Sequence, residues 1–501
     1  MNVALRCAIR LLALAALVGH AVPARADQNV FVVDLASDPA SLDPHVQWDP
    51  DSYAVYRNVF DNLVARDATG TIIGQVATSW HYTSPTQVAF EIRDDIHFQD
   101  GTALTPADVV FSVKRITSPA FKSPQLSQFD SIVNAEVTGP HEVTLTTKTP
   151  YPVLLAQLVK LSIVPQASVE RAGDAKFNQQ PMGSGPYRFV SRTQGVQIDL
   201  AANDAYWRGK PPFPHVEMHP VPQEATRIAD VRTAHADITR ILSTDDADAL
   251  RSEANVKVLW TPTERVTMLS LNALTGATKD VRVREAAALA IDKKTLIEAL
   301  LRGYAKPVNE PLTSASFGFA ADIPDYGYNP DRARALLKEA GVTPQTPVSF
   351  LTSPIFDQRV VQALQQMLGD VGIDAKISSV DAATYLRLRQ GRPDEAGDVS
   401  YFRWSCGCED ADGTLFPLFE SSSQWAKYQN PEVDKALLAA RNSLDPKERL
   451  ADYHQALTLI HADVPVVPLF QDVVMFAARK QVQFQPTADE AFFLFPMRWS
   501  P

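Results

Sequence analysis

The segment Tyr401–Gly413 concentrates side chains that could bind a charged organic molecule. It carries the aromatic rings of Tyr401 and Trp404, the guanidinium of Arg403 and three carboxylates within thirteen residues. An arginine beside a tryptophan can pair with a ligand carboxylate while the ring stacks on the same ligand. A salt bridge between Arg403 and an acid of the segment is an equally good interpretation.

The same segment holds Cys406 and Cys408, the only cysteines after residue 26. Three interpretations remain open for them. They could be free or loosely paired thiols, or they could form a local disulfide that stiffens the segment in an oxidising compartment. A metal site is the third interpretation, although two thiolates without a nearby histidine are too few for a closed site.

Five elements precede the segment and should position it. Alternation and helical spacing of apolar residues predict strands at Pro347–Leu351, Ile373–Val380 and Asp398–Phe402, with helices at Phe356–Val371 and Ala382–Gln390 between them. A β-α-β-α-β order predicts a parallel sheet. Ligands of such sheets lie beyond the carboxyl ends of the strands. The residues from Arg403 to Gly413 should therefore line a ligand crevice.

The N-terminus has the pattern of a secretory leader. Arg6 and Arg10 precede the apolar run Leu11–Val18, and Ala24-Arg25-Ala26 is a small-x-small cleavage signal. The run is too short to span a bilayer, which takes about 20 residues. We therefore expect cleavage after Ala26 and export to the periplasm as a soluble chain.

Composition limits the classes of function. The chain has 501 residues, 45% of them hydrophobic, and a net charge of −11, so loss of three leader arginines gives 475 residues and −14. This length predicts two or three domains. An acidic surface argues against binding to nucleic acid or anionic lipid.

Enzyme motifs are not found in the sequence. It contains no Gly-x-Ser-x-Gly and no His-Glu-x-x-His, and its histidines are scattered. We therefore expect no catalytic residues, no cofactor and no metal site, with an exported hydrolase as the less favoured alternative.

Elsewhere the sequence predicts one long helix at Val281–Leu301 and two closing strands at Val464–Phe470 and Val473–Ala477.

A set of motifs in fixed order resembles the large solute-binding proteins of ABC importers, the dipeptide/oligopeptide/nickel-binding class (bacterial extracellular solute-binding protein family 5). The resemblance covers essentially the whole chain after the leader. Its motifs are Ser41-Leu42-Asp43-Pro44, Phe60-Asp61-Asn62-Leu63, Phe98-Gln99-Asp100-Gly101 with Thr105-Pro106-Ala107-Asp108, Pro181-Met182-Gly183-Ser184-Gly185-Pro186-Tyr187, Ala205-Tyr206-Trp207-Arg208-Gly209-Lys210, Val281-Arg282-Val283-Arg284-Glu285-Ala286, Asn329-Pro330, Asn430-Pro431-Glu432-Val433-Asp434 and Pro465-Val466-Val467-Pro468-Leu469.

The resemblance implies an α/β, two-lobed periplasmic-binding-protein fold, with mixed sheets flanked by helices, a two-strand hinge and an extra subdomain on lobe one. The implied boundaries are 1–26 for the signal peptide, 27–62 and 183–265 for lobe one, 63–182 for the extra subdomain, 266–475 for lobe two and 476–501 for the return to lobe one.

The resemblance also implies a non-enzymatic protein that closes on a peptide or peptide-like solute and delivers it to an inner-membrane permease. ATP hydrolysis would occur on separate ATPase subunits, and the binding protein would be a monomer. Within the class, an opine, a sugar conjugate or a chelated metal are alternative ligands.

Dipeptide-specific members of the family hold the two peptide ends with an acid three residues after the loop tryptophan and an arginine near the end of the first lobe-two strand. Here Gly407 follows Trp404 by three residues, and Leu351-Thr352-Ser353-Pro354 has no arginine. A small dipeptide held in that way is therefore not expected.

Asp410 and Asp412 match acids of the family loop, and two roles stay open for them. They either brace the loop through backbone N–H groups or meet a cationic group of the ligand. Trp48 follows the Ser41-Leu42-Asp43-Pro44 motif, and its side chain either forms part of the pocket wall or packs on the protein surface. The candidate ligand-binding residues are Trp404, Arg403, Asp410, Asp412, Trp48, Ser405 and Tyr401.

Overall fold

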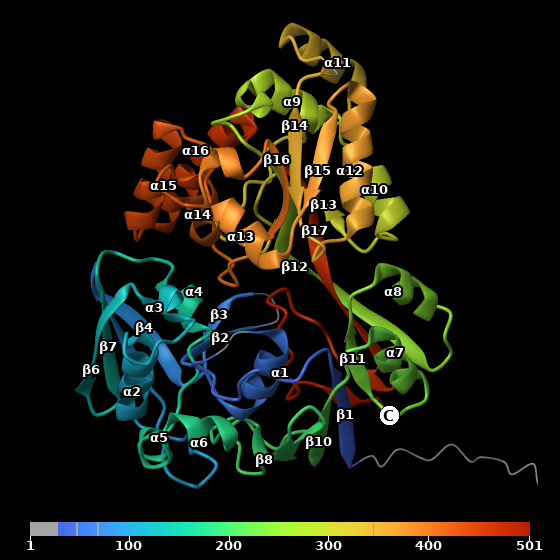
Figure 1. Ribbon diagram of the computed structural model, residues 1–501. Helices are drawn as coiled ribbons and strands as arrows, with labels where there is room; N and C mark the ends of the chain where they lie inside the picture. Colours follow the sequence, from blue (N-terminus) through green and yellow to red (C-terminus); the bar gives the residue numbers. More distant parts are fainter. Residues whose placement is uncertain (1–28, 47–48, 68–69, 344, 501) are drawn as a thin grey trace, which may run out of the picture.

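The chain forms two lobes joined by two long strands (Figure 1). The computed structural model describes residues 29–500 except 47–48, 68–69 and 344. Strands β12 (Val256–Leu271) and β17 (Val466–Arg479) pair antiparallel along most of their length and run from one lobe into the other. Both lobes therefore share one hydrogen-bonded ladder.

This ladder is part of an eleven-stranded mixed sheet with the order β15-β14-β16-β12-β17-β11-β1-β10-β9-β8, and β13 pairs with β17 off this path. In lobe two, β14 pairs parallel with both β15 and β16, as the β-α-β-α-β pattern predicts. The lobe-two strands are β13 (Lys306–Pro307), β14 (Val348–Thr352), β15 (Ala375–Ser379) and β16 (Val399–Trp404). The lobe-one strands are β1 (Val30–Leu35), β8 (Tyr187–Thr193), β9 (Gln197–Ala202), β10 (His215–Pro220) and β11 (Ile238–Ile241).

The β12–β17 ladder is interrupted where it passes between the lobes. Its register shifts between Pro262 and Val266, and again between Thr267 and Met268. Pro262 has no N–H to donate, and a bulge bends a strand and increases its twist. The interruption is therefore the place where the two lobes can turn relative to each other with the least loss of hydrogen bonds.

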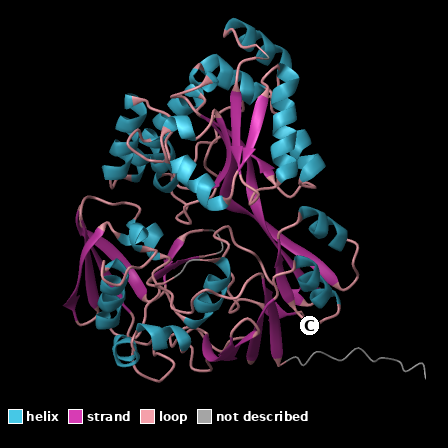
Figure 2. Cartoon of the chain, in the orientation of Figure 1, coloured by secondary structure: helices cyan, strands magenta, loops and turns pink. Residues whose placement is uncertain are grey.

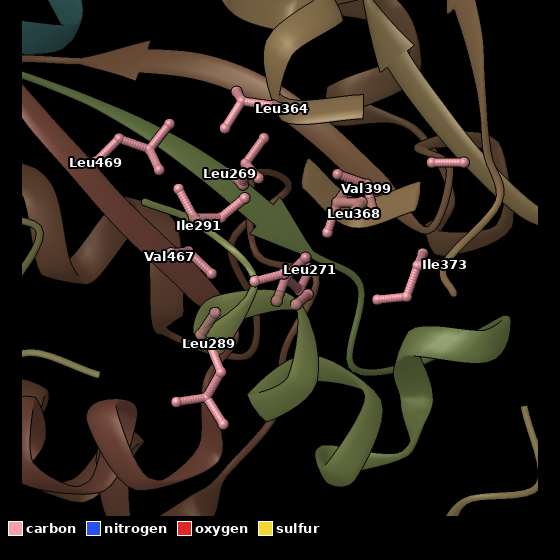
Figure 3. Packing of buried hydrophobic residues seen from close by; sticks show 14 of the residues in the cluster. Leu269, Leu271, Leu289, Ile291, Leu364, Leu368, Ile373, Val399, Val467 and Leu469 are labelled. Atoms are coloured by element: carbon pink, nitrogen blue, oxygen red, sulfur yellow. The ribbon is translucent and has the colours of Figure 1, made fainter. Parts of the chain in front are cut away.

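Lobe two is built around a leucine-rich core. Leu269 and Leu271 of β12 pack against Leu364 and Leu368 of the helix α12 (Gln358–Val371), all of them fully buried (Figure 3). Helices cover both faces of this sheet (Figure 2). The other lobe-two helices are α9 (Val281–Leu289), α10 (Lys293–Leu300), α11 (Pro330–Glu339), α13 (Ala382–Gln390), α14 (Asp412–Phe419), α15 (Pro431–Asn442) and α16 (Pro446–Asp463).

A second sheet forms a subdomain beside lobe one. Its strands follow the order β4-β5-β7-β6, and all of its pairs are antiparallel. Its elements are β4 (Ala77–Ser84), β5 (Gln87–Ile92), β6 (Ile132–Gly139) and β7 (Glu142–Thr147), with α2 (Pro106–Thr117), α3 (Leu126–Phe129) and α4 (Leu154–Leu158). Lobe one itself also contains α1 (Pro50–Val59), α5 (Gln166–Ala172), α6 (Asp174–Gln179), α7 (Glu224–Arg232) and α8 (Thr244–Leu250). The short strands β2 (Val64–Arg66) and β3 (Ile72–Gly74) pack on the core of the subdomain.

Two predictions of secondary structure are wrong. The single helix expected at Val281–Leu301 is divided into α9 and α10, because Asp292 accepts a hydrogen bond from Thr295 N and so caps a new helix. The two closing strands are one strand, β17, because its pairing with β12 resumes on both sides of Asp472, with Val473 opposite Pro262 and Gln471 opposite Val266.

Asp43 of the Ser41-Leu42-Asp43-Pro44 motif has a structural role. Its carboxylate is fully buried and receives two hydrogen bonds from Arg115 of α2, at 2.5 and 3.0 Å. The same guanidinium reaches Asp174 at 2.7 Å. The motif therefore joins the beginning of lobe one to its subdomain.

Replacing Arg115 by methionine should destabilise the protein by about 3–5 kcal/mol, because it leaves the buried Asp43 carboxylate without an opposite charge. Chemical denaturation followed by circular dichroism measures the loss. Arg93→Met is the control, since Arg93 and Asp95 form an exposed pair worth about 0–1 kcal/mol. Equal losses for the two variants would contradict the structural role of Asp43.

Candidate functional site

A cavity lies between the lobes, against the hinge strands. Its volume is about 770 Å³, enough for a small organic molecule. Leu242 and Thr244 line it from lobe one, and Ile355 and Phe356 line it from lobe two. Two apolar side chains at this boundary, Leu242 and Ile355, are more than half exposed. The walls therefore offer apolar contact from both lobes.

Tyr401 and Arg403 of β16 line the same cavity. Their side chains share one face of the sheet because successive residues of a strand alternate between faces. Phe356 packs edge-on against Tyr401, with ring centroids 5.2 Å apart, and the Arg403 guanidinium lies 5.7 Å from the Phe356 ring. The Arg403 side chain is 41% exposed, so it can contact a bound molecule.

Asp472 of β17 supplies a carboxylate opposite Arg403. Its Oδ1 accepts a hydrogen bond from Thr267 Oγ1 at 2.8 Å, and its Oδ2 lies 3.8 Å from Arg403 Nη1. Within the described part of the chain, Oδ2 accepts no hydrogen bond. Burial raises the pKa of the Asp472 carboxyl, and the Arg403 charge and Thr267 partly oppose that rise. A cationic group placed beside Oδ2 would compensate the buried charge.

A second charged group lies on the lobe-one side of the cavity. Glu490 accepts a hydrogen bond from Arg240 at 2.6 Å and forms an ion pair with Arg265 at 3.2 Å. The Arg240 Nε is buried and has no acceptor among the described residues. The cavity lining includes five acids and four arginines, which suits a ligand that carries both signs of charge.

Asp410 and Asp412 lie away from the cavity. Arg449 donates two hydrogen bonds to Asp410, at 2.8 and 3.0 Å, and Arg441 donates one to Asp412 at 3.0 Å. Asp410 Oδ1 also accepts the N–H of Asp412 at 3.0 Å. Burial raises the pKa of both carboxyls, and the two arginines oppose that rise. Their observed contacts brace the loop within lobe two.

Trp404 and Ser405 follow Arg403 but do not line the cavity. Trp404 donates its indole N–H to Gly413 O at 2.9 Å and packs edge-on against Trp425. Both residues are partly buried. Trp48 lies outside the described residues, so its position is not assigned.

The segment 406–409 extends from lobe two onto the subdomain of lobe one. Lys160 Nζ donates to Cys406 O at 2.8 Å, and Arg66 donates to Cys408 O and forms an ion pair with Glu409 at 3.0 Å. Cys408 is fully buried against Val153 and Ala156. The segment therefore joins the two lobes at one edge of the cleft.

Glu264 of β12 fixes the same segment from the hinge. Its carboxylate accepts the backbone N–H groups of Gly407 and of Glu409, the latter at 3.0 Å. Gly407 has φ +65°, and a Cβ there would lie 2.3 Å from Lys160 Nζ. The position of the family acid that meets a dipeptide amine is thus closed to any side chain unless Lys160 moves.

Cys406 and Cys408 are joined by a disulfide. It closes the tip of the segment that contacts lobe one, where Gly413 approaches both sulfur atoms so closely that a Cβ would lie 2.6 Å from Cys408 Sγ. The covalent link and the small glycine together fix the path of the segment.

The other edge of the cleft is joined by exposed charges. Asp245 of α8 in lobe one pairs with Arg302 at 2.8 Å and with Arg359 of α12 at 2.5 Å, both in lobe two. All three side chains are more than 40% exposed. This edge is joined by solvated ion pairs, whereas the edge at segment 406–409 is buried.

The described residues contain neither a membrane-spanning helix nor a cluster of metal ligands. No described helix is long and apolar enough to cross a bilayer, and no cluster of three or more His, Cys, Asp or Glu side chains there could hold a metal ion.

Sequence reasoning missed Asp472, Glu490, Arg240 and Arg265. Asp472 could have been found from its pattern, because Gln471-Asp472 is a polar pair inside a strongly apolar run, Val464–Ala477. Glu490 and Arg240 are 250 residues apart, and no local pattern indicates that they meet.

Comparison with known proteins now identifies the family. Residues 71–426 match the family described as bacterial extracellular solute-binding proteins, family 5 Middle. The glutathione-binding protein GsiB of Salmonella paratyphi A is 28% identical over 478 residues, covering 92% of each chain. The chain belongs to this family of ABC-importer solute-binding proteins, and the prediction made from its motifs is confirmed.

Solved structures agree on the fold. The substrate-binding protein CtaP of Listeria monocytogenes superposes with a TM-score of 0.87 at 21% identity, over 95% of this chain and all of that one. The binding protein DppA of Helicobacter pylori, solved with the peptide STSA, gives 0.77 at 24% identity, over 94% and 98% of the two chains. The expected two-lobed periplasmic-binding-protein fold is confirmed. The relatives are solute-binding proteins and not enzymes, and the family is an extracellular one.

Docking of segment 406–409 should weaken as pH rises. Burial raises the pKa of Glu409 to about 7, against the opposing charge of Arg66. The docked segment therefore favours the protonated form of Glu409. The stability of the folded protein should fall as the pH rises from the ordinary pKa of a glutamate to about 7. The melting temperature of the wild type, measured from pH 5 to 8, should fall relative to that of Glu409→Gln. The control variant Glu298→Gln, at an exposed residue, should show the same pH dependence of melting temperature as the wild type. If the wild type and Glu409→Gln gave parallel curves of melting temperature against pH, the expectation would be refuted.

Removing the disulfide should have a small effect on folding, because it closes a very short loop. We expect Cys406→Ser/Cys408→Ser to lose about 1–2 kcal/mol of unfolding free energy. Urea unfolding of the double variant and of the wild type with and without reductant measures this loss. A loss above about 4 kcal/mol would mean that the disulfide supports more than its own segment.

Proposed function

We propose that this protein binds a peptide-like solute with a free α-amino-acid head group, in which an ammonium and a carboxylate are attached to the same carbon. The single observation that carries the proposal is the Asp472–Arg403 pair. Asp472 Oδ2 accepts no hydrogen bond from the described residues and lies 3.8 Å from Arg403 Nη1, at the cavity wall. The ammonium of the solute would bind to Asp472, and its carboxylate would bind to Arg403.

The rest of the cavity supports a solute longer than a single amino acid. Arg240 and Arg265, which share Glu490, offer a site for a second carboxylate. Apolar side chains of both lobes also line the cavity. Glutathione, named for the GsiB relatives, has an α-amino-acid head and a second carboxylate, so it is our first candidate.

Candidate residues for ligand contact are Arg403, Tyr401 and Asp472. The observed contacts of Trp404, Asp410, Asp412 and Ser405 favour an indirect role, in which they fix the end of β16 and the loop that follows it. An opine also carries an α-amino-acid head and stays the second candidate, whereas a sugar conjugate or chelated metal would leave Asp472 unpaired.

The biological role follows from the family. We propose that the chain acts as a monomer in the periplasm after cleavage at Ala26, and that the form closed on its solute docks on an inner-membrane permease whose ATPase subunits drive import. Closure is a population shift, which requires that the solute contact both lobes. Arg403 in lobe two and Arg240 in lobe one provide such contacts. No step in this role requires catalysis by the chain.

Isothermal titration calorimetry tests the ligand class. Glutathione should bind, and its α-linked isomer Glu-Cys-Gly should bind at least about 30-fold more weakly, because it has no carboxylate on the carbon that bears the ammonium. Native mass spectrometry of protein purified without denaturation should detect a retained solute with the same head group. Equal affinity for both isomers, or a retained solute without an amine, would overturn the proposal.

Arg403→Gln and Asp472→Asn should each weaken binding by at least about 30-fold, since each removes a charged contact to the head group of the solute. Melting temperatures should change little for Arg403→Gln. Arg392→Gln, an exposed arginine of the same lobe, is the control and should leave affinity unchanged. Unchanged affinity in both cavity variants would move the head-group site elsewhere.

A further inference from the structure

Lobe two contains two buried cations outside the solute cleft. Arg389, near the end of α13, is 2% exposed, and Lys427, before α15, is 4% exposed. Both line a small cavity of about 10 Å³. The solute-binding role does not use either residue.

Arg389 has only neutral partners. Its Nη1 donates to Ser270 Oγ at 3.4 Å, it hydrogen-bonds the Tyr385 hydroxyl, and its guanidinium lies 5.0 Å from the Phe402 ring. An arginine stays charged at any pH the protein meets. The Arg389 charge is therefore buried among dipoles and a ring.

Lys427 also donates its hydrogen bonds to neutral groups. Its Nζ donates to Gln424 O at 2.9 Å and to Ala426 O at 3.4 Å. Burial, together with the nearby Arg389 charge, lowers its pKa to about 8. At neutral pH the amine is still mostly protonated, so two positive charges share the cavity.

No carboxylate compensates these charges in the described part of the chain. The other cavity-lining residues are Ser270, Phe402, Leu418, Phe419, Trp425, Tyr428, Pro465 and Val466. By contrast, the buried Arg449 of the same lobe is paired with Asp410 at 2.8 Å. A buried charge is costly unless an opposite charge or a metal compensates it.

We propose that this cavity is a binding site for one small monovalent anion of halide size, held between the Arg389 guanidinium and the Lys427 amine. A volume near 10 Å³ accommodates about one water-sized particle. Sulfate and phosphate are too large for it. Ser270 Oγ can donate a third hydrogen bond to the anion.

The site lies directly behind the wall of the solute cleft. Phe402, which packs on Arg389, stands between Tyr401 and Arg403 in β16 and points to the opposite face of the sheet. Tyr385, the other Arg389 neighbour, donates to Tyr401 O at 2.7 Å. A bound anion would thus neutralise charge behind the strand that carries two cleft residues.

Anomalous diffraction tests the site directly. Crystals of the wild-type protein grown without halide and then soaked in sodium bromide should give an anomalous peak within hydrogen-bond distance of Arg389 and Lys427. A peak there supports the proposal. A cavity that holds only water, while other bromide sites on the protein are occupied, overturns it.

Thermal unfolding tests the site in solution. At equal ionic strength, the wild type should melt about 2 °C higher in sodium chloride than in sodium gluconate. Arg389→Met and Lys427→Met should each remove that difference. Arg387→Leu, an exposed arginine on the same helix, is the matched control and should keep it.

These outcomes discriminate even if one variant folds poorly. A chloride effect that persists in both cavity variants overturns the proposal, because it must arise elsewhere. The absence of any chloride effect in the wild type overturns it as well. Neither result bears on solute binding, since the anion site and the cleft are tested by different ligands.

Discussion

Both lobes share the two strands β12 and β17, and this shared ladder limits how the lobes can move relative to each other. Relative motion of the lobes has to be absorbed where the ladder is interrupted, between Pro262 and Val266. Asp472 lies across from this interruption, and its backbone carbonyl accepts a hydrogen bond from Thr263. A solute bound at Asp472 therefore contacts the segment whose geometry changes when the lobes turn.

The charges of the cleft occur as pairs that a bound molecule could rearrange. Arg403 lies near Asp472, and Arg240 and Arg265 share Glu490. Pairs of this kind reduce the cost of an empty cleft, and a solute with both signs of charge can replace one partner without leaving the other unpaired. A solute of a single sign would leave one of these charged groups without its partner, which is the reason that we propose a zwitterionic solute.

The sequence predicted the parts of the fold that depend on local pattern. Helix α13 has the predicted bounds, and the parallel pairing of β14 with β15 and β16 followed from the alternation of strands and helices. The division of Val281–Leu301 was not predicted, because a helix-like composition hid the capping role of Asp292. Local helix propensity predicts that a helix forms in a segment, but it predicts the residue at which the helix ends less well.

The candidate site was predicted only in part, for a physical reason. Arg403 was placed at the cleft because strand ends have a known position in such sheets. Asp410 matched a family acid, but the arginine that neutralises it comes from α16, 39 residues later. Glu490 lies near the end of the chain, whereas its partners Arg240 and Arg265 come from the middle of the chain. Contacts between distant segments are set by packing, which no single stretch of sequence encodes.

The two edges of the cleft are joined by interactions of different kinds, and this has a consequence for how a solute enters. In Figure 1, helix α8, which carries Asp245, lies on the right, and α4, which precedes Lys160, lies on the left. Dissolved ions screen the exposed Asp245 pairs but hardly reach the buried contacts of Arg66. We therefore expect salt to loosen the α8 edge before the disulfide edge, so that a solute reaches the cavity more readily from the α8 side.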